Sequence, residues 1–324
     1  MFLWEQFLAF ERRNNLFKYK DSSGIHVWDI VRFQIYINLL WQNSSVHQKG
    51  QKRDYKYICY NLFFWFKALF VRKKYLLYLA SRNRCKDGTL IDKNAANVMA
   101  CLPLGDAILL ESSVKSNSPC LKYNESFVLG LFPFSFCTRF IKRPKYDFAS
   151  LLSLVRLTFP QCSMTTSQLE KLYNLFYIQK RFYAFYLHRW GIQKVFLTQN
   201  GIQKGLIAAC RDLRIPIYEF QHGIVDRGHL AYSYPSQIPS DSVYLPNKIF
   251  SFSDFWFKNL NLPGVQVLAI GNDAFSILPT LKTENYKNGV LVVSADVFGE
   301  ELSNFLMDCF SDDDPGKFTY YFKF

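Results

Sequence analysis

Short apolar runs alternate with amphipathic stretches along the second half of the chain. The pattern predicts buried strands over 194–199, 215–221, 248–253, 265–271, 289–295 and 317–324, and a further apolar run in the first half predicts a strand over 74–82. It predicts helices over 165–190 and 200–214, a helix that begins at 254, and one over 296–310. Short strands that alternate with helices are typical of parallel sheets built from βαβ units. The pattern therefore predicts an α/β fold.

The first part of the chain has helical periodicity. Residues 1–45 are expected to be helical, with a break at Lys-Asp-Ser-Ser-Gly (20–24), and a polar linker is expected over 42–56. Residues 120–165 carry no clear pattern. The helix over 165–190 has the clearest periodicity, and Ser167 is its expected N-cap.

A segment rich in proline and serine, 233–248, predicts a boundary between two α/β domains. We expect an N-terminal domain over 1–245 and a second domain over 246–324. The strands at 194–199 and 215–221 should then be neighbours in one sheet, and the strands after 246 should form another. A terminal strand of a doubly wound domain is normally followed by a helix. Because the chain ends on an apolar strand, the second domain is expected to be incomplete.

The charge and the aromatic content indicate which kind of partner the protein binds. The formal net charge is +13, hydrophobic residues make up 49% and aromatic residues 18%. We find no zinc-finger spacing, RNP-like run or long basic block, so nucleic acid is not an expected partner. Basic residues instead alternate with aromatic residues over 63–80 and 139–146. This mixture favours contact with an anionic membrane surface, and the alternative for 63–80 is a solvated helix face followed by a buried strand.

The cysteines and the apolar stretches indicate the cellular compartment of the protein and whether it holds a metal. None of the eight cysteines stands in a C-x-x-C pair, and no Cys/His cluster has metal-site spacing, so no metal or other cofactor is expected. Charged residues interrupt the apolar N-terminus, and no stretch reaches the ~20 apolar residues that a membrane-spanning helix needs. We therefore expect a cytoplasmic protein with reduced cysteines, peripheral to the inner face of the cell membrane.

Candidate chemistry begins where the strand over 215–221 ends. Ligands of open α/β sheets bind beyond the carboxyl ends of the strands. Gln221, His222 and Gly223 fall at such an edge, and Arg227 and His229 follow. A histidine there can exchange a proton near neutral pH, and a glycine allows close backbone approach. The alternative is that His222 only caps the strand and His229 is an ordinary loop residue.

Small or polar residues also end the later strands. Ser253-Asp254, Gly271-Asn272 and Ser294-Ala295 stand at strand-to-helix turns, where backbone amides can face a phosphate. Ordinary turns use the same residues, and Asp254 is expected to cap the helix that follows it.

Two further positions have competing interpretations. Glu219 is either a strand residue on a polar face or a side chain that orients His222. Trp28 and Arg32 lie one helical turn apart, so a cation–π or structural pair is expected there rather than a site.

The stretches 219–235 (EFQHGIVDRGHLAYSYP), 249–256, 267–272 and 289–302 resemble bacterial surface-polysaccharide glycosyltransferases of the GT-B type. Residues 14–36 also resemble the opening of capsule and lipopolysaccharide biosynthesis proteins. The resemblance implies two Rossmann-like domains that face a cleft, the first for the acceptor and the second for the nucleotide sugar. Such proteins usually continue past the strand at 317–324 into a His-Pro donor-binding loop, so this chain resembles a C-terminally truncated member.

The resemblance implies transfer of a sugar from a nucleotide sugar to an oligosaccharide or lipid-linked acceptor. His222 would be the catalytic residue. The expected substrate-binding residues are Gln221, Gly223, Arg227, His229, Gly271, Asn272 and Ser294. No Asp-x-Asp motif is present, so no metal is implied. Two alternatives stay open, a non-catalytic remnant or membrane-associated scaffold of polysaccharide assembly, and a CDP-polyol phosphotransferase.

Overall fold

The computed structural model divides the chain into two compact units, Met1–Gly271 and Asn272–Phe324. The structure describes residues 2–41, 55–79, 83–84, 90–92, 101–111, 127–130, 146–201, 203–271, 289–293 and 319–323, with single positions 95, 98 and 134.

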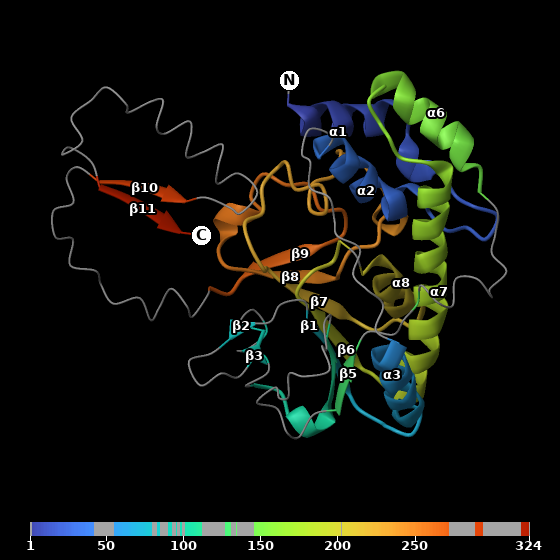
Figure 1. Cartoon of the computed structure of the whole chain (residues 1–324), viewed down its shortest axis with the longest axis vertical. Helices are drawn as coiled ribbons and strands as arrows, with labels where there is room; N and C mark the ends of the chain where they lie inside the picture. The colour runs from blue at the N-terminus through green and yellow to red at the C-terminus, as the bar shows by residue number, and fades with distance from the viewer. Residues whose placement is uncertain are drawn as a thin grey trace. The chain divides into compact units, whose positions relative to one another are not determined.

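A seven-stranded sheet forms the centre of the first unit, and every strand pair in it is parallel (Figure 1). Its strands, in spatial order, are β5 (Phe127–Gly130), β4 (Ala107–Glu111), β1 (Tyr75–Leu79), β6 (Lys194–Leu197), β7 (Ile217–Phe220), β8 (Lys248–Ser251) and β9 (Gln266–Ala269). The predicted α/β class is confirmed. The strand β4 lies inside the sheet although we did not predict it, and β2 (Asn83–Arg84) pairs with β3 (Leu90–Ile91) in a separate antiparallel ribbon.

The strand order creates a switch point. From β1 the chain adds β4 and then β5 on one side, returns to place β6 on the other side of β1, and continues outward to β9. The connection that follows β1 therefore runs toward β4 on one side, and the connection that follows β6 runs toward β7 on the other side. The switch point lies between β1 and β6. Ligand crevices of open parallel sheets lie at this point, outside the carboxyl ends of the strands.

The expected division into two sheets at 245/246 is wrong for β8 and β9. Tyr218 of β7 pairs with Lys248 of β8, and Lys248 pairs with Gln266 of β9, so both strands extend the first sheet. The physical reason lies in the segment 233–248, whose prolines and serines predict a domain boundary. Its Tyr234, Val243, Tyr244 and Leu245 side chains are buried in the core of the unit, so the segment packs as core.

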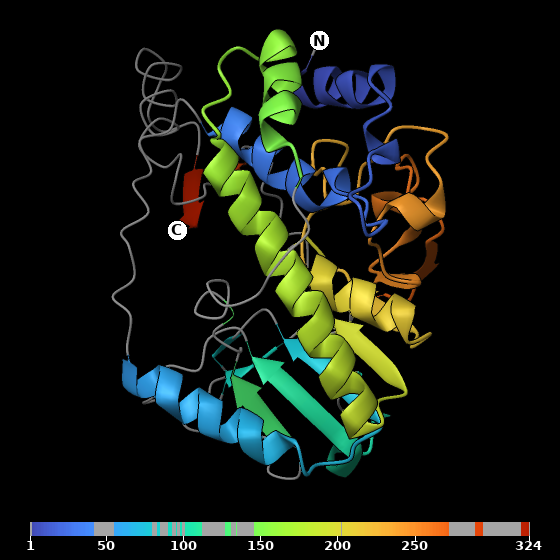
Figure 2. The ribbon, with the colours of Figure 1, turned by 90° about the vertical axis from the view of Figure 1, so that its right-hand side faces the viewer.

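The helices in the described ranges of the first unit are α1 (Leu3–Arg13), α2 (Trp28–Leu40), α3 (Tyr55–Ala68), α6 (Phe148–Thr158), α7 (Thr166–Trp190) and α8 (Lys204–Asp212). Figure 2 shows α7 running along the unit, with α3 near one end and α1, α2 and α6 near the other. None of the helices in the described ranges has both the length and the apolar character needed to cross a bilayer.

The N-cap of α7 is Thr165 rather than the expected Ser167. The Gln168 N–H donates to Thr165 Oγ1 at 3.2 Å, and the Thr165 N–H donates to Gln168 Oε1 at 2.8 Å. Each side chain thus satisfies a backbone donor of the first turn, the reciprocal pattern of a capping box. The helix ends at Gly191, whose φ of 75° suits glycine.

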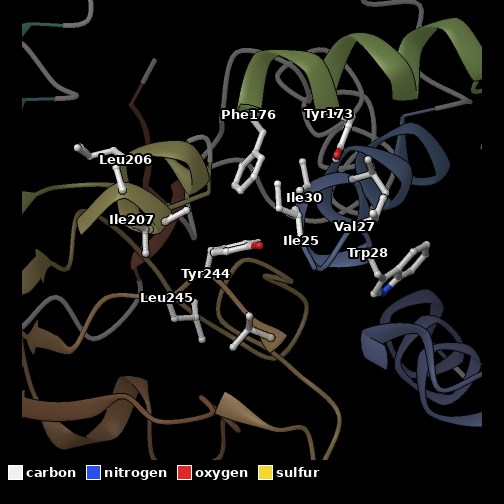
Figure 3. Close-up of a cluster of buried hydrophobic side chains, with 14 of the residues drawn as sticks. Ile25, Val27, Trp28, Ile30, Tyr173, Phe176, Leu206, Ile207, Tyr244 and Leu245 are labelled. Carbon is white, nitrogen blue, oxygen red and sulfur yellow. The ribbon is translucent and has the colours of Figure 1, made fainter. Parts of the chain in front are cut away.

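The hydrophobic core joins segments that are distant in sequence. Figure 3 shows one such cluster, in which Phe176 of α7 and Tyr244 lie between Leu206 and Ile207 of α8 on one side and Ile25 and Tyr173 on the other. The helices α7 and α8 approach so closely that a Cβ at Gly205 would lie 2.5 Å from Gln179 Cβ. Burial of these side chains attaches the N-terminal helices to the second half of the sheet.

The second unit contains a parallel pair of strands, β10 (Gly289–Val293) and β11 (Thr319–Lys323), with Gly289 opposite Thr319. The strands predicted at 289–295 and 317–324 are therefore present. The helix predicted over 296–310 lies outside the described residues. In the first unit, the helix predicted to begin at 254 is only the short 3₁₀ turn Asp254–Trp256, and Ser253 rather than Asp254 occupies its N-cap.

Candidate functional site

Polar side chains gather at the carboxyl edge of the sheet beside the switch point. Thr198 and Asn200 follow β6, His222 follows β7, and Asp92 follows β3. Thr198 Oγ1 donates to Asp92 Oδ2 at 3.3 Å, and both side chains are buried. These four residues form the edge cluster together with two side chains that contact it, Glu219 and Tyr232.

His222 is half-buried at the end of β7. Its Nδ1 lies 3.5 Å from the Tyr232 hydroxyl, and its ring meets the His229 ring with centroids 6.5 Å apart. Burial lowers the pKa of His222, and the negative charge of Asp92 partly opposes this shift. The imidazole is therefore neutral at neutral pH, the form that can accept a proton.

Glu219 lies in β7, three residues before His222, and its carboxyl group has no exposed surface. Asn200 donates to it twice, from its backbone N–H to Oε1 at 3.1 Å and from Nδ2 to Oε2 at 2.8 Å. The Tyr232 hydroxyl donates to Oε1. Burial raises the pKa of Glu219 to about 7, against the lowering effect of these hydrogen bonds and of Lys204. The burial of Glu219 contradicts the interpretation as a strand residue on a polar face, and the contact between Glu219 and His222 runs through the Tyr232 hydroxyl.

Gln221 has a structural role. Its side chain is 1% exposed, donates to the Gly223 carbonyl at 2.8 Å, and accepts from Ser251 Oγ at 3.0 Å and the Phe252 N–H at 2.9 Å. The amide thereby holds the ends of β7 and β8 together, and its oxygen and nitrogen are both engaged. Gln221 fixes the position of the loop that carries His222.

His229 lies inside the same loop region. Its ring stacks on Phe33 of α2 at 6.0 Å and meets Tyr232 edge-on at 4.9 Å. Burial, reinforced by His222, lowers its pKa, and its Nδ1 is buried without a hydrogen-bond partner. Through these contacts His229 packs beside His222. His229 is therefore not the ordinary loop residue of the alternative interpretation.

The remaining predicted substrate-binding residues differ in their exposure and surroundings. A Cβ at Gly223 would meet no atom within 4 Å, so the space beside it is open. Arg227 is exposed on the same loop. Gly271 is exposed after β9 with a φ of 81°, a conformation that favours glycine. Asn272 and Ser294 lie outside the described residues.

The loop after His222 is anchored to the N-terminal helices by Arg32. Its guanidinium pairs with Glu11 of α1 at 2.6 Å and donates to the Leu230 and Ser233 carbonyls. Trp28 donates to the same Glu11 carboxylate at 2.7 Å. Trp28 and Arg32 thus have the expected structural role through their shared partner Glu11, whereas the cation–π contacts of Arg32 are with Phe17 and Tyr234 rather than with Trp28.

A second buried ion pair joins α2 to α8. Lys204 Nζ lies 3.1 Å from Asp29 Oδ2 and also donates to the Tyr234 hydroxyl at 3.1 Å. Tyr234 donates to Asp29 Oδ1 at 3.0 Å, and the Tyr244 N–H donates to Oδ2 at 2.7 Å. Buried charges persist when they are paired and hydrogen-bonded, so this network attaches Tyr234 and Tyr244 to α2 and α8.

A cavity of about 510 Å³ lies at the opposite, amino edge of the sheet. It is lined where β7, β8 and β9 begin, by Arg211, Pro216, Asn247 and Gly264 among others. It includes no residue of the edge cluster. Within the described ranges, no three His, Cys, Asp or Glu side chains are grouped to hold a metal ion.

Sequence reasoning missed most of the edge cluster. Thr198 was assigned to the preceding strand, although the polar Thr-Gln-Asn-Gly after a buried run was a readable signal. Asp92 and Tyr232 carry no comparable signal, because their positions depend on the ribbon β2–β3 and on the path of the loop after His222.

Comparisons with known proteins add little to this geometry. No protein-family model matches the sequence, and no curated protein matches it. The crystal structure of MurG from Acinetobacter baumannii is similar, with 11% sequence identity and a TM-score of 0.37. The match covers 77% of this chain and 66% of MurG. Similarity at this level carries no argument about activity, so any functional conclusion depends on the residues themselves.

Proposed function

We propose that this protein is a glycosyltransferase that uses a nucleotide-sugar donor, with His222 as its general base. The observation that carries the proposal is the place of His222, half-buried at the carboxyl edge of the parallel sheet next to the switch point, with open space beside Gly223. The resemblance of 219–235 to surface-polysaccharide glycosyltransferases supports the same assignment.

The chemistry needs one proton acceptor. A hydroxyl of the acceptor oligosaccharide or lipid-linked sugar transfers its proton to neutral His222 while its oxygen bonds to the anomeric carbon of the donor. The bond between that carbon and the phosphate oxygen breaks, and the nucleotide leaves with the electron pair. Cations and backbone amides stabilise the phosphate charge, and Arg227 is the exposed cation on the same loop.

The donor side of the proposal rests on residues after the first sheet. Gly271, Asn272 and Ser294 stay predicted donor-binding residues, and the assignment of the acceptor to the first domain and the donor to the second stays a prediction. A protein with this activity would work at the cytoplasmic face of the cell membrane, where lipid-linked acceptors are present.

Contact with anionic lipid is the second part of the proposal, and α3 supports it. One face of α3 packs on α7 through Trp65, whose ring lies 5.6 Å from that of Trp190. The opposite face and the turn after it expose Leu62, Phe63, Phe66 and Phe70, the last at 73%. Lys67 lies on this face with Nζ 4.7 Å from the centre of the Phe63 ring, and Arg72 follows it. Exposed aromatic rings with adjacent cations suit an anionic bilayer surface.

The test is a binding screen of CMP-, UDP-, GDP- and CDP-linked donors, followed by turnover assays with the donor that binds. His222→Ala should lower turnover by roughly 10²–10⁴-fold with the melting temperature retained, the usual range for a positioned acid–base group. His229→Ala, in the same packing, is the control and should lose less. Full turnover in His222→Ala would refute the role of His222. Binding of no donor would favour a non-catalytic scaffold, and transfer of a polyol phosphate from a CDP-linked donor would favour the phosphotransferase alternative.

A further inference from the structure

Three hydrogen-bond donors meet the Glu219 carboxyl group. They are the Asn200 N–H, the Asn200 amide Nδ2 and the Tyr232 hydroxyl. An ionised carboxylate can only accept, so the single proton of the Tyr232 hydroxyl is committed to Glu219. Toward His222 the tyrosine oxygen can then offer only a lone pair.

This commitment decides which nitrogen of His222 carries the proton. His222 Nδ1 lies 3.5 Å from the Tyr232 oxygen. Since that oxygen is an acceptor in this direction, Nδ1 must be the protonated nitrogen for the contact to be a hydrogen bond. Nε2 then has the free lone pair on the far side of the ring.

We propose that Tyr232 is a positioning residue for His222: its hydroxyl, held by Glu219, keeps the imidazole proton on Nδ1 and leaves Nε2 to receive the acceptor's proton. The tautomer follows from hydrogen-bond geometry alone, whereas its catalytic use rests on the function proposed above.

The arrangement makes the tautomer sensitive to pH. When Glu219 takes up a proton, it can donate to the Tyr232 oxygen, and the tyrosine proton becomes free to turn toward Nδ1. The imidazole proton then moves to Nε2. Lys204 faces Glu219 and favours its charged form, Asp92 raises the pKa of His222, and His222 lowers the pKa of His229.

Asn200 makes a conservative variant at Glu219 feasible. Its Oδ1 is buried without a partner. In Glu219→Gln, rotation of the Asn200 amide by half a turn would let Oδ1 accept from the new NH₂ group, while the remaining oxygen still accepts from Tyr232. This variant should keep the Nδ1–H tautomer and lose its dependence on pH near 7.

The experiment is long-range ¹H–¹⁵N NMR of the full chain, with the His222 signals assigned by their loss in His222→Ala. The wild type should show the Nδ1–H tautomer at pH 8 and a shift toward Nε2–H as the pH falls below 7. Tyr232→Phe should shift His222 toward Nε2–H at pH 8 and lower kcat about tenfold or more, with KM changed less. Tyr234→Phe removes a buried hydroxyl of the same loop that bonds Asp29 instead, and should leave the tautomer unchanged.

An Nε2–H tautomer in the wild type at pH 8 would overturn the proposal, and so would an unchanged tautomer in Tyr232→Phe. If Tyr232→Phe does not fold, Glu219→Gln tests the proposal instead. A His222 tautomer that still changes with pH near 7 in this variant would contradict the proposal. The expected tautomers together with full turnover in His222→Ala would refute the proposed function alone.

Discussion

Arg32 of α2 and Glu11 of α1 form an ion pair at 2.6 Å, with the two side chains 1% and 0% exposed. The same guanidinium binds the Leu230 and Ser233 carbonyls in the loop that follows His222. Arg32 therefore connects both N-terminal helices to the loop that carries the candidate site.

Removing that cation should destabilise the whole unit. Arg32→Met leaves the Glu11 carboxylate buried without its counter-ion, and breaking a buried pair in this way costs about 3–5 kcal/mol. The control is Lys74→Met at the exposed Lys74–Asp106 pair, which should lower the unfolding free energy far less because solvent screens the two charges. Urea denaturation of both variants measures the difference. A loss in Arg32→Met no larger than in the control would contradict the argument.

Glu219 should make stability depend on pH in an unusual direction. Its pKa rises from 4.5 to about 7 on folding because the side chain is buried, so between these values the folded state binds more protons than the unfolded state. Stability then falls as the pH rises from 4.5 to 7, by about 3 kcal/mol relative to a neutral residue. Glu219→Gln removes this contribution, so wild type should lose stability relative to the variant across this window. The measurement is the unfolding free energy of both proteins at each pH, and a constant difference would be the opposing result.

Gly205 should tolerate no side chain. A Cβ there would meet Gln179 Cβ at 2.5 Å and the Phe176 carbonyl at 3.0 Å, where α8 packs on α7. Overpacking costs about 1–3 kcal/mol, of which the helix propensity of alanine offsets up to about 1 kcal/mol. Gly205→Ala should therefore lower the melting temperature, whereas Gly105→Ala, which meets no atom within 4 Å, should change it little. Equal melting temperatures for the two variants would show that the helices can separate freely.

The exposed face of α3 should bind anionic vesicles. Full-length protein should sediment with vesicles of anionic lipid more than with neutral ones, and salt should weaken the binding because it screens the cations. Replacing Phe63, Phe66 and Phe70 by serine should abolish most of it. Leu157→Ser on α6, where the side chain is 82% exposed, is the matched control. Retained vesicle binding in the triple variant would remove α3 as the contact, and self-association lost in that variant instead would identify a second copy as the partner of this face.

The periodicity of the sequence predicted the α/β class and the positions of β6, β7, β8 and β9. Strands that are buried on both faces are continuous apolar runs, and turn-forming residues flank them on both sides. The same local pattern placed His222 at a strand end. Local pattern cannot show which strands pair, so β8 and β9 were assigned to a second sheet although their backbones bond to the first. Proline and serine in 233–248 indicated a linker, while the buried Tyr234 and Tyr244 make it core.

The sequence could predict only those residues of the site that are neighbours along the chain. Gln221, His222 and Gly223 could be located because they end one strand. The carboxyl group of Glu219, the hydroxyl of Tyr232 and the amide of Asn200 meet through tertiary packing. Only that packing decides that Gln221 is structural, that Glu219 is buried, and that a tyrosine ten residues after His222 faces its ring. Sequence determines which chemical groups are available at the strand ends, whereas the tertiary structure decides which groups desolvate and orient one another, because both effects depend on distances between segments remote along the chain.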